Sequence, residues 1–220
     1  YSMAIVVGCI ERPLDRGGHS LYCSLVYINT EGEIESVHRK LMPTYEERLT
    51  WSAGDGHGLV VHPLQKFTVG ALNCWENWMP LARSALYAQG EDLHIALWPG
   101  NVRNTTDISR FIAQESRSYV LSVCGLMYPD NIPEDVPFAD LIKENAPLWL
   151  ANGGTCIVSP DGSWILEPVV HKEGLFTATI DHKEVRKERQ NFDLAGHYSR
   201  PDVLKLHVNR KRQSTVEFED

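Results

Sequence analysis

Apolar and polar residues follow one another along the first third of the chain in the pattern of short β-strands. Residues 3–11 are apolar and β-branched and predict a buried strand. Residues 20–29 and 34–41 predict the next two strands, joined by a hairpin-like turn, and the three together predict an antiparallel meander. Two more strands are predicted at 59–63 and 67–74. The second of these is apolar throughout, which places it centrally in a sheet.

Apolar positions with helical spacing occur between the strands that follow. Residues 80–90 predict one helix and residues 105–118 predict another. Strands are predicted at 92–99 and 119–127. The residues expected on one face of the second helix are Ile108, Phe111 and Ile112. This alternation of strand and helix predicts α/β packing with a layered sheet.

The last third of the chain contains weaker patterns. Residues 128–151 are rich in proline and charge and predict an excursion from the core with one short helix. A hairpin with a Pro-Asp-Gly turn is predicted at 155–170, a strand at 174–180 and a polar helix at 181–190. Apolar and polar residues alternate at 203–208, which predicts an exposed or intermolecular strand.

Composition predicts a soluble globular chain with one domain, residues 1–220, in which 203–220 form a C-terminal tail. Of the 220 residues, 43% are hydrophobic and 23% are charged, which is enough apolar material for a sizeable core. The formal net charge of −8 argues against nucleic acid or an anionic membrane as the main partner. The basic run at 210–212 is isolated and is interpreted as a solvated strand end. The longest apolar stretch is too short to span a bilayer.

Cysteine usage indicates a reducing compartment, and we expect a cytoplasmic protein. The five cysteines are scattered and lack CxxC spacing, so neither a disulfide framework nor a zinc site is predicted. The glycine-rich stretch 54–58 lacks the GK[ST] and the following helix of a phosphate loop. His57 and His62 lack metal-ligand spacing, and the chain contains no GxSxG.

Cys74 is the first candidate for chemistry. It follows an apolar strand, where a buried and inert thiol is the common case. However, it lies where a strand passes into a loop, which is where α/β sheets tend to place their sites. The WENWMP cluster that follows it is unusual for a plain core. From these residues alone, the buried thiol and the nucleophile both stay open.

Four segments carry motifs of a known family. They are HRKLMPTYEERLTW (38–51), GALNCWENW (70–78), LWPGNVRN (97–104) and AGHYSRPDVL (195–204). Together they resemble the nitrilase superfamily of carbon–nitrogen hydrolases, and specifically its true nitrilase branch, over nearly the whole chain. The resemblance implies that the family's lysine, second glutamate and nucleophilic cysteine are Lys40, Glu47 and Cys74, at the family's spacing.

Elementary chemistry predicts a role for each of these residues. A thiol near pKa ~8.5 is only a few per cent ionised at neutral pH, and the ammonium of Lys40 would raise the thiolate fraction of Cys74. Lys40 and the backbone N–H of Trp75 would stabilise the negative charge that develops during attack. Glu47 would keep Lys40 charged and oriented, whereas its neighbour Glu46 is expected to face solvent.

The resemblance also implies a set of substrate-binding residues, for which structural roles stay open. The set consists of Trp75, Glu76, Trp98, Pro99 and His197. A structural hydrogen bond or salt bridge is at least an equal alternative for Glu76. The tryptophans fit an apolar pocket and a core equally well, and a structural role for His197 is about as plausible as one in the site.

The sequence departs from the family in one respect. The family's general base is a glutamate in an FPE segment that follows the first helix, and no such segment occurs here. Glu11 is the only acidic residue of the opening strand, and we do not expect it to replace that base. The implied fold is therefore a four-layer αββα sandwich that is N-terminally incomplete, within a longer polypeptide.

The resemblance implies hydrolysis of an organic nitrile to a carboxylic acid and ammonia through a cysteine thioimidate and thioester, with no metal and no organic cofactor. Cyanide hydratase or dihydratase and amidase are the alternatives within the superfamily. A non-catalytic fragment or assembly subunit is the alternative of another class. The implied partners are the substrate and further copies of the chain. These would form dimers that build a spiral or filament, with 203–208 as a candidate for exchange between subunits.

Overall fold

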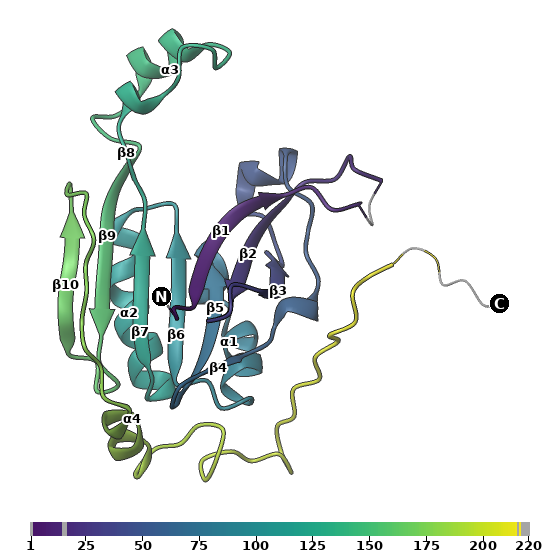
Figure 1. The fold of residues 1–220 in the computed structure, drawn as a ribbon, viewed down its shortest axis with the longest axis vertical. Coiled ribbons are helices and arrows are strands. Elements are labelled where there is room, and N and C mark those ends of the chain that lie inside the picture. Colours follow the sequence, from purple (N-terminus) through teal and green to yellow (C-terminus); the bar gives the residue numbers. More distant parts are fainter. Residues whose placement is uncertain (1, 15–16, 215, 217–220) are drawn as a thin grey trace. The chain divides into compact units, whose positions relative to one another are not determined.

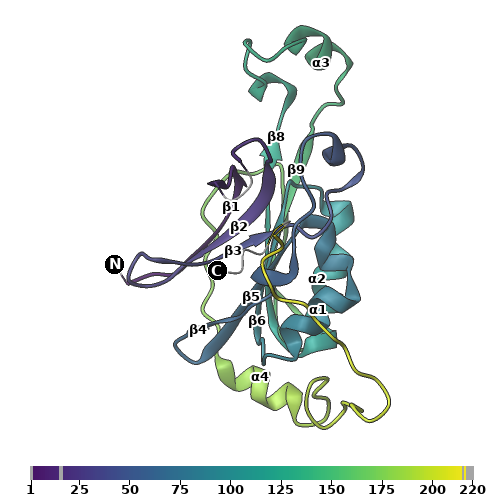
Figure 2. The same cartoon turned by 90° about the vertical axis from the view of Figure 1, so that its right-hand side faces the viewer.

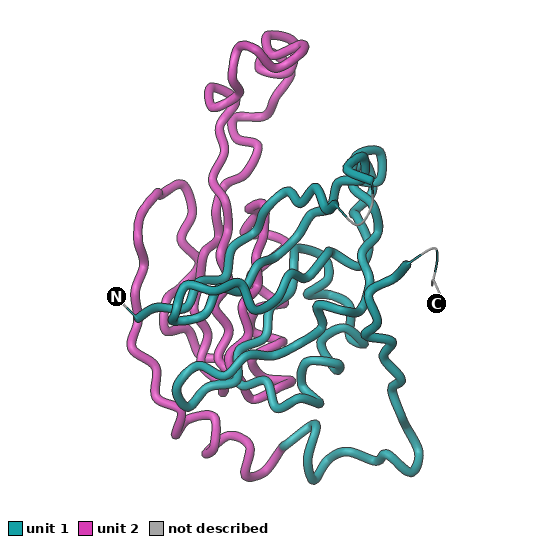
Figure 3. Tube along the Cα trace, turned by 45° about the vertical axis from the view of Figure 1, so that its right-hand side comes forward, with its two compact units in different colours: residues 1–92, 193–220 teal, residues 93–192 magenta. Residues whose placement is uncertain are grey.

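The computed structural model describes residues 2–14, 17–214 and 216, which fall into two compact units (Figure 3). Unit 1 contains residues 1–92 and 193–220, and unit 2 contains residues 93–192. The expectation of one domain over 1–220 stays a prediction. Within the described residues, every helix is too short or too polar to cross a membrane.

Unit 1 opens with the predicted antiparallel meander (Figure 1). Strand β2 (Tyr22–Ile28) pairs with β1 (Ile5–Glu11) on one side and with β3 (Ile34–Arg39) on the other. The prediction that the first strand is buried is wrong, because most of its side chains are exposed, with Ile10 at 66%. In the described part of the chain β1 pairs with β2 alone, so its edge and much of its surface face solvent.

The rest of unit 1 leads from β3 to the segment around Cys74. Its strands and helices are η2 (Tyr45–Leu49), η3 (Gly56–Gly58), β4 (His62–Leu64), β5 (Phe67–Asn73), η4 (Cys74–Trp78) and α1 (Pro80–Tyr87). Strands β4 and β5 form an antiparallel hairpin. Helix α1 packs Ala82, Ala85 and Leu86 against Leu59 and Leu72, and this core anchors the end of β5 where the η4 turn begins.

Unit 2 is a small α/β sheet with strand order β6-β7-β9-β10. Strands β6 (Leu93–Trp98) and β7 (Tyr119–Cys124) run parallel and are joined through helix α2 (Val102–Ser116). Strand β9 (Ala151–Val158) is antiparallel to both β7 and β10 (Trp164–Val170). Helix α2 covers one face of this sheet (Figure 2). The predicted βαβ alternation and the 155–170 hairpin are therefore confirmed.

Helix α2 differs from its prediction in two respects. It begins before residue 105, because the Asn101 side chain caps it by accepting a hydrogen bond from the backbone N–H of Arg103 at 3.1 Å. Ile108 and Ile112 are buried as predicted, but Phe111 is 51% exposed. The buried face follows Thr105, Ser109, Ile112 and Ser116, and Phe111 lies about a third of a turn from it.

Residues 128–151 leave the sheet of unit 2 as predicted, on a stalk formed by β8 (Leu126–Met127) and the start of β9 (Figure 1). The excursion contains η5 (Pro129–Asn131) and helix α3 (Ala139–Asn145). The polar helix α4 (His182–Arg189) ends the unit, and its Arg189 side chain donates to the hydroxyl of Ser118 at 3.0 Å.

Two predicted strands do not form. Residues 174–180 have no strand structure and Leu175 is 91% exposed, because no described strand pairs with this segment. Residues 203–208 also form no strand within the chain, and their apolar side chains remain accessible, so the intermolecular alternative stays a prediction. Alternation of apolar and polar residues is thus insufficient where a partner strand is missing. The last residues of the predicted tail, 215 and 217–220, lie outside the described residues.

The basic run at 210–212 is not a solvated strand end. Arg212 donates to the buried carboxylate of Asp55 at 3.0 Å and to the backbone carbonyl of Val37 at 3.2 Å. The backbone N–H of Gln213 reaches the other oxygen of Asp55 at 3.0 Å. Within unit 1 the tail therefore contacts β3 and the start of η3, because the buried carboxylate of Asp55 needs hydrogen-bond donors.

Candidate active site

Lys40 is a buried cation, with only 1% of its side chain exposed. It follows the last residue of β3, where its backbone N–H donates to the carbonyl of Cys23 at 2.8 Å. Its ammonium donates to Glu47 Oε2 at 2.5 Å and to the hydroxyl of Thr44 at 3.1 Å. A buried ammonium needs such partners, because an unpaired charge away from water is strongly disfavoured.

Glu47 reaches Lys40 because the short helix η2 turns it back. Pro43 and Thr44 precede η2, and the backbone N–H of Thr44 donates to Glu47 Oε2 at 2.6 Å. Burial raises the pKa of the Glu47 carboxyl, but the bonds from Lys40 and Thr44 outweigh it and hold that pKa below its usual range. Glu46 is exposed, as the sequence predicts. Glu47 is thus an anion at neutral pH.

Cys74 occupies a strained backbone position at the end of β5. Its φ angle is +52°, in the left-handed region that residues with a side chain rarely adopt. It is the first residue of η4, so its side chain projects from the turn where strand becomes helix. Such backbone conformations cluster at functional sites because the surrounding structure must hold them in place.

Opposing effects act on the Cys74 thiol. Burial raises its pKa, and the Lys40 ammonium and the Trp75 backbone N–H oppose this by stabilising the thiolate. The carboxylates of Glu47 and Glu76 raise the pKa further, and the net shift is upward. The predicted influence of Lys40 is present, but it does not by itself make Cys74 a thiolate at neutral pH. The thiol therefore needs a proton acceptor during attack.

Glu76 joins the two strand ends that carry Lys40 and Cys74. It is 1% exposed, and its Oε1 accepts the backbone N–H of Leu41 at 2.6 Å. Its Oε2 accepts the backbone N–H of Asn73 at 3.0 Å. Leu41 directly follows Lys40, and Asn73 directly precedes Cys74. These bonds favour the structural alternative for Glu76 over substrate binding, since both oxygens already have protein donors.

Glu11 is held in an ion pair of its own. Arg39 donates to it through Nη2 at 2.7 Å, and Ser24 donates through its hydroxyl at 2.7 Å. Burial raises the pKa of Glu11, but these donors outweigh it and the net pKa is lowered. Glu11 would have to give up a charge-assisted bond from Arg39 to take up a proton, and the expectation that it is not the general base stays a prediction.

The remaining substrate-binding candidates have different environments. Trp75 is 43% exposed and lies near Trp78, with ring centroids 6.1 Å apart. His197 is exposed, and its ring contacts Tyr198. In unit 2, Pro99 is exposed, whereas Trp98 is buried and its indole N–H has no hydrogen-bond partner among the described residues. Of these residues, Trp75 is the one whose contact with Cys74 the structure describes.

The arrangement in unit 1 suits nucleophilic attack followed by stabilisation of a developing anion. The Lys40 ammonium and the Trp75 N–H can stabilise negative charge, and Cys74 provides the nucleophilic sulfur. In the part of the chain that the structure describes, no three His, Cys, Asp or Glu side chains gather closely enough to hold a metal ion.

Comparison with known proteins identifies the family. The sequence profile of the carbon–nitrogen hydrolases matches residues 1–190. The chain belongs to the carbon–nitrogen hydrolase family. It is 38% identical over 217 residues to Nitrilase 2 of Arabidopsis thaliana, covering 97% of this chain and 63% of that protein. It is 37% identical over 212 residues to an aliphatic nitrilase of Sinorhizobium fredii (strain HH103), covering 96% of this chain and 67% of that protein. The chain thus spans less than two thirds of the length of the Arabidopsis relative.

Solved structures of carbon–nitrogen hydrolases share the fold. Nit3 of Saccharomyces cerevisiae, a nitrilase superfamily member, matches 90% of this chain and 67% of its own with a TM-score of 0.70 at 17% identity. The nitrilase-type α/β fold predicted from the sequence is therefore confirmed. At this level of identity the likeness concerns the fold alone.

Two further residues lie in the candidate site without a motif that names them. His38 is fully buried and its Nε2 lies 3.0 Å from Glu76 Oε1, which fixes the orientation of that carboxylate. Cys23 shares the electrostatic surroundings of Cys74, and burial raises its pKa while Lys40 lowers it. The sequence could have indicated His38, because it lies two positions before Lys40. Side chains two positions apart lie on the same face of an extended strand.

Proposed function

We propose that this chain carries the cysteine site of an enzyme that hydrolyses an organic nitrile to a carboxylic acid and ammonia. The observation that carries the proposal is the convergence of Lys40, Glu47 and Cys74 in one compact unit, with the ammonium paired to the carboxylate and acting on the thiol. The nitrilases among the relatives support the choice of a nitrile as the substrate class.

The proposed reaction consumes two waters. The sulfur of Cys74 attacks the nitrile carbon, the thiol proton leaves to a base, and the nitrile nitrogen takes up a proton to give a thioimidate. Lys40 and the Trp75 N–H stabilise the charge on that nitrogen. Water then adds, ammonia leaves, and a thioester remains. A second water hydrolyses the thioester, which releases the acid and restores the thiol.

The base is proposed to be a carboxylate other than Glu47 and Glu76. Glu47 already accepts from Lys40 and Thr44, and Glu76 accepts from two backbone N–H groups and His38. Either carboxylate would have to give up a charge-assisted bond to take the thiol proton. We therefore propose that Glu47 orients Lys40 and stabilises its ammonium form.

The cellular setting and assembly also belong to the proposal. We expect a cytoplasmic enzyme that forms homo-oligomers, with dimers building a spiral or filament. The free cysteines are compatible with a reducing compartment. The exposed apolar side chains on β1 and at 203–208 offer surface for contacts between copies.

Ammonia release tests the proposal. The purified protein is assayed with a panel of aliphatic and aromatic nitriles, the corresponding amides and cyanide, beside the Cys74→Ala variant. Release from an organic nitrile is expected, and Cys74→Ala is expected to reduce it at least about 10⁴-fold while the circular dichroism spectrum stays unchanged.

Three outcomes contradict the proposal in different ways. Turnover of amides or of cyanide alone would replace it with one of the alternative activities. Full turnover in Cys74→Ala would remove the nucleophile. Absence of release together with absence of a covalent adduct on the Cys74 peptide would favour the non-catalytic fragment or assembly subunit.

A further inference from the structure

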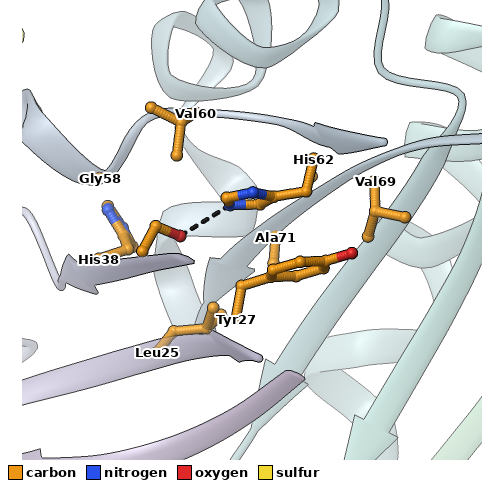
Figure 4. Close-up of a pocket in the computed structure, with 10 residues that line it drawn as sticks. Leu25, Tyr27, His38, Gly58, Val60, His62, Val69 and Ala71 are labelled. Carbon is orange, nitrogen blue, oxygen red and sulfur yellow. Dashed lines mark hydrogen bonds between the residues drawn. The ribbon is translucent and has the colours of Figure 1, made fainter. Parts of the chain in front are cut away.

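A second cluster of hydrogen-bonded side chains lies on β3 and β4 and consists of Glu35, Ser36 and His62. It shares no residue with the cluster around Cys74. The hydroxyl of Ser36 lies 2.7 Å from His62 Nε2, the hydrogen bond drawn as a dashed line at His62 in Figure 4. On the other side of the ring, His62 Nδ1 lies 2.9 Å from Glu35 Oε2. A carboxylate accepts hydrogen bonds, so Nδ1 carries the proton and donates to Glu35. Nε2 is then the acceptor, and Ser36 donates to it. This is the order of nucleophile, base and orienting carboxylate.

The His62 ring is held in a fixed orientation. It stacks on the Tyr27 ring, as Figure 4 shows. The ring centroids are 3.9 Å apart and the planes differ by 7°. Burial lowers the pKa of His62, and Glu35 opposes this only in part, so the net pKa lies below its usual range. The imidazole is therefore neutral at neutral pH, which is the form that can accept a proton.

Ser36 borders a cavity that is open to solvent. Glu35 and Ser36 line a depression of about 430 Å³ together with His57, Val60 and Arg210. That volume falls in the range of small-molecule sites, which run from about 300 to 1,000 Å³. His57 lies 3.2 Å from the backbone carbonyl of Arg210 through its Nδ1, so the C-terminal tail forms part of the rim. All these residues belong to unit 1.

A second, smaller cavity limits what can bind. It lies between Leu25, Tyr27, His62 and Val69 (Figure 4). Its volume is only about 10 Å³. This is about the space of one water molecule, so no organic group enters behind Ser36. A substrate must therefore lie in the outer cavity, where Arg210 contributes a positive charge.

We propose that Ser36 is a second nucleophile, activated by His62 and Glu35, which accepts the acyl group of a small carboxylic ester bound in the cavity lined by Arg210. The Ser36 oxygen bonds to the ester carbonyl carbon, and its proton passes to His62 Nε2. The bond from that carbon to the alcohol oxygen breaks, and the alcohol leaves with the proton from His62. Water then hydrolyses the acyl-serine to the free acid. This site is independent of the proposed nitrile hydrolysis, because it uses neither Cys74 nor Lys40.

Acetyl transfer from p-nitrophenyl acetate tests the proposal. The background is Cys74→Ala, so that acylation of the other nucleophile does not contribute. The acetylated peptides are quantified by mass spectrometry after a short exposure at pH 7.5. Ser163 is the internal control, because it is exposed and its hydroxyl donates to Asp161 at 2.6 Å instead of to a histidine.

Ser36 is expected to be acetylated about 10² times faster than Ser163, the lower end of the range for general-base catalysis. His62→Gln is expected to remove most of that difference, and Glu35→Gln is expected to reduce it about tenfold. Ser36→Ala removes the adduct. Each variant is checked by circular dichroism and thermal unfolding.

Equal acetylation of Ser36 and Ser163 would overturn the proposal and leave the three side chains as a structural link between β3 and β4. An unchanged rate at Ser36 in His62→Gln would overturn it as well. If His62→Gln fails to fold, Glu35→Gln decides, because Glu35 is already partly exposed at the rim. A reduced rate in that variant supports the proposal, and an unchanged rate contradicts it.

Discussion

At the scale of single residues, the motif singled out Lys40, Glu47 and Cys74, and the structure shows how the chain brings these three together. Lys40 and Glu47 are seven positions apart and a short helical turn joins them, so this pair is local and readable from sequence. The contacts of Glu76 with Leu41 and His38 span 35 and 38 positions. Such long-range contacts have no local pattern, which is why the sequence left a structural role for Glu76 open but could not name its partners.

The hydrogen bonds that Glu76 accepts lead to a prediction about stability. Glu76→Gln puts an amide N–H₂ where a carboxylate oxygen now accepts a backbone N–H, from Leu41 or from Asn73, so two donors would face each other in a buried site. The free energy of unfolding is expected to fall by about 1–3 kcal/mol, measured by urea denaturation. Glu46→Gln is the matched control, because Glu46 is exposed, and it is expected to stay within about 0.5 kcal/mol of the wild type. Equal urea midpoints for the two variants would contradict a stabilising role of the Glu76 hydrogen bonds.

At the scale of elements, most strands and helices that have partners were predicted, although the strand expected at 59–63 forms only at His62–Leu64. The two predicted strands without described partners do not form within the chain. The β1–β3 meander, the βαβ segment and the 155–170 hairpin occur where the sequence places them. Residues 174–180 and 203–208 have the right composition for strands but no described neighbour to pair with. A strand is stabilised by its neighbours more than by its own residues, so composition alone overpredicts it.

The glycine-rich stretch 54–58 also gains a physical explanation at this scale. It is not a phosphate loop but a segment packed tightly on the strand end that carries the site. A Cβ at Gly58 would lie 2.3 Å from the Cα of His38, and a Cβ at Gly54 would lie 2.1 Å from the carbonyl oxygen of Arg39. Only glycine permits this approach.

Gly58→Ala is therefore expected to destabilise unit 1. The contact is with backbone, which cannot move aside as a flexible side chain can, so a loss of about 1–3 kcal/mol is expected. Thermal unfolding measures the change. Gly174→Ala serves as control, because its Cβ would meet only the Phe176 ring at 3.6 Å. A Gly58→Ala variant as stable as Gly174→Ala would show that the packing is looser than described.

At the scale of the whole molecule, charge and exposed apolar surface act in opposite directions. The net charge of −8 favours solubility, while β1 presents Ile5, Val7 and Ile10 to solvent along a sheet edge. The sequence predicted the strand but not its exposure, because burial depends on what covers a strand and not on its own pattern.

Self-association through β1 is the prediction that follows. Ile10→Lys is expected to shift the sedimentation-velocity distribution toward smaller species, since a charge on a sheet edge opposes pairing with another copy. Leu175→Lys is the control, because Leu175 is equally apolar and 91% exposed but lies outside any strand. Identical distributions for the two variants would assign association to another surface.

The central claim is that the Lys40 ammonium acts on the Cys74 thiol, and the pH dependence of alkylation measures this most directly. Iodoacetamide labelling of the Cys74 peptide is followed by mass spectrometry across pH 6–11 in the wild type, Lys40→Met and Lys66→Met. Lys66 is exposed and serves as the matched control. Because burial raises the pKa of Cys74 and Lys40 lowers it, the wild-type midpoint is expected above the usual thiol range of about 8.5. Lys40→Met is expected to move it higher still and to leave the exposed Cys9 unchanged. A Cys74 midpoint that is the same in all three proteins would contradict the account.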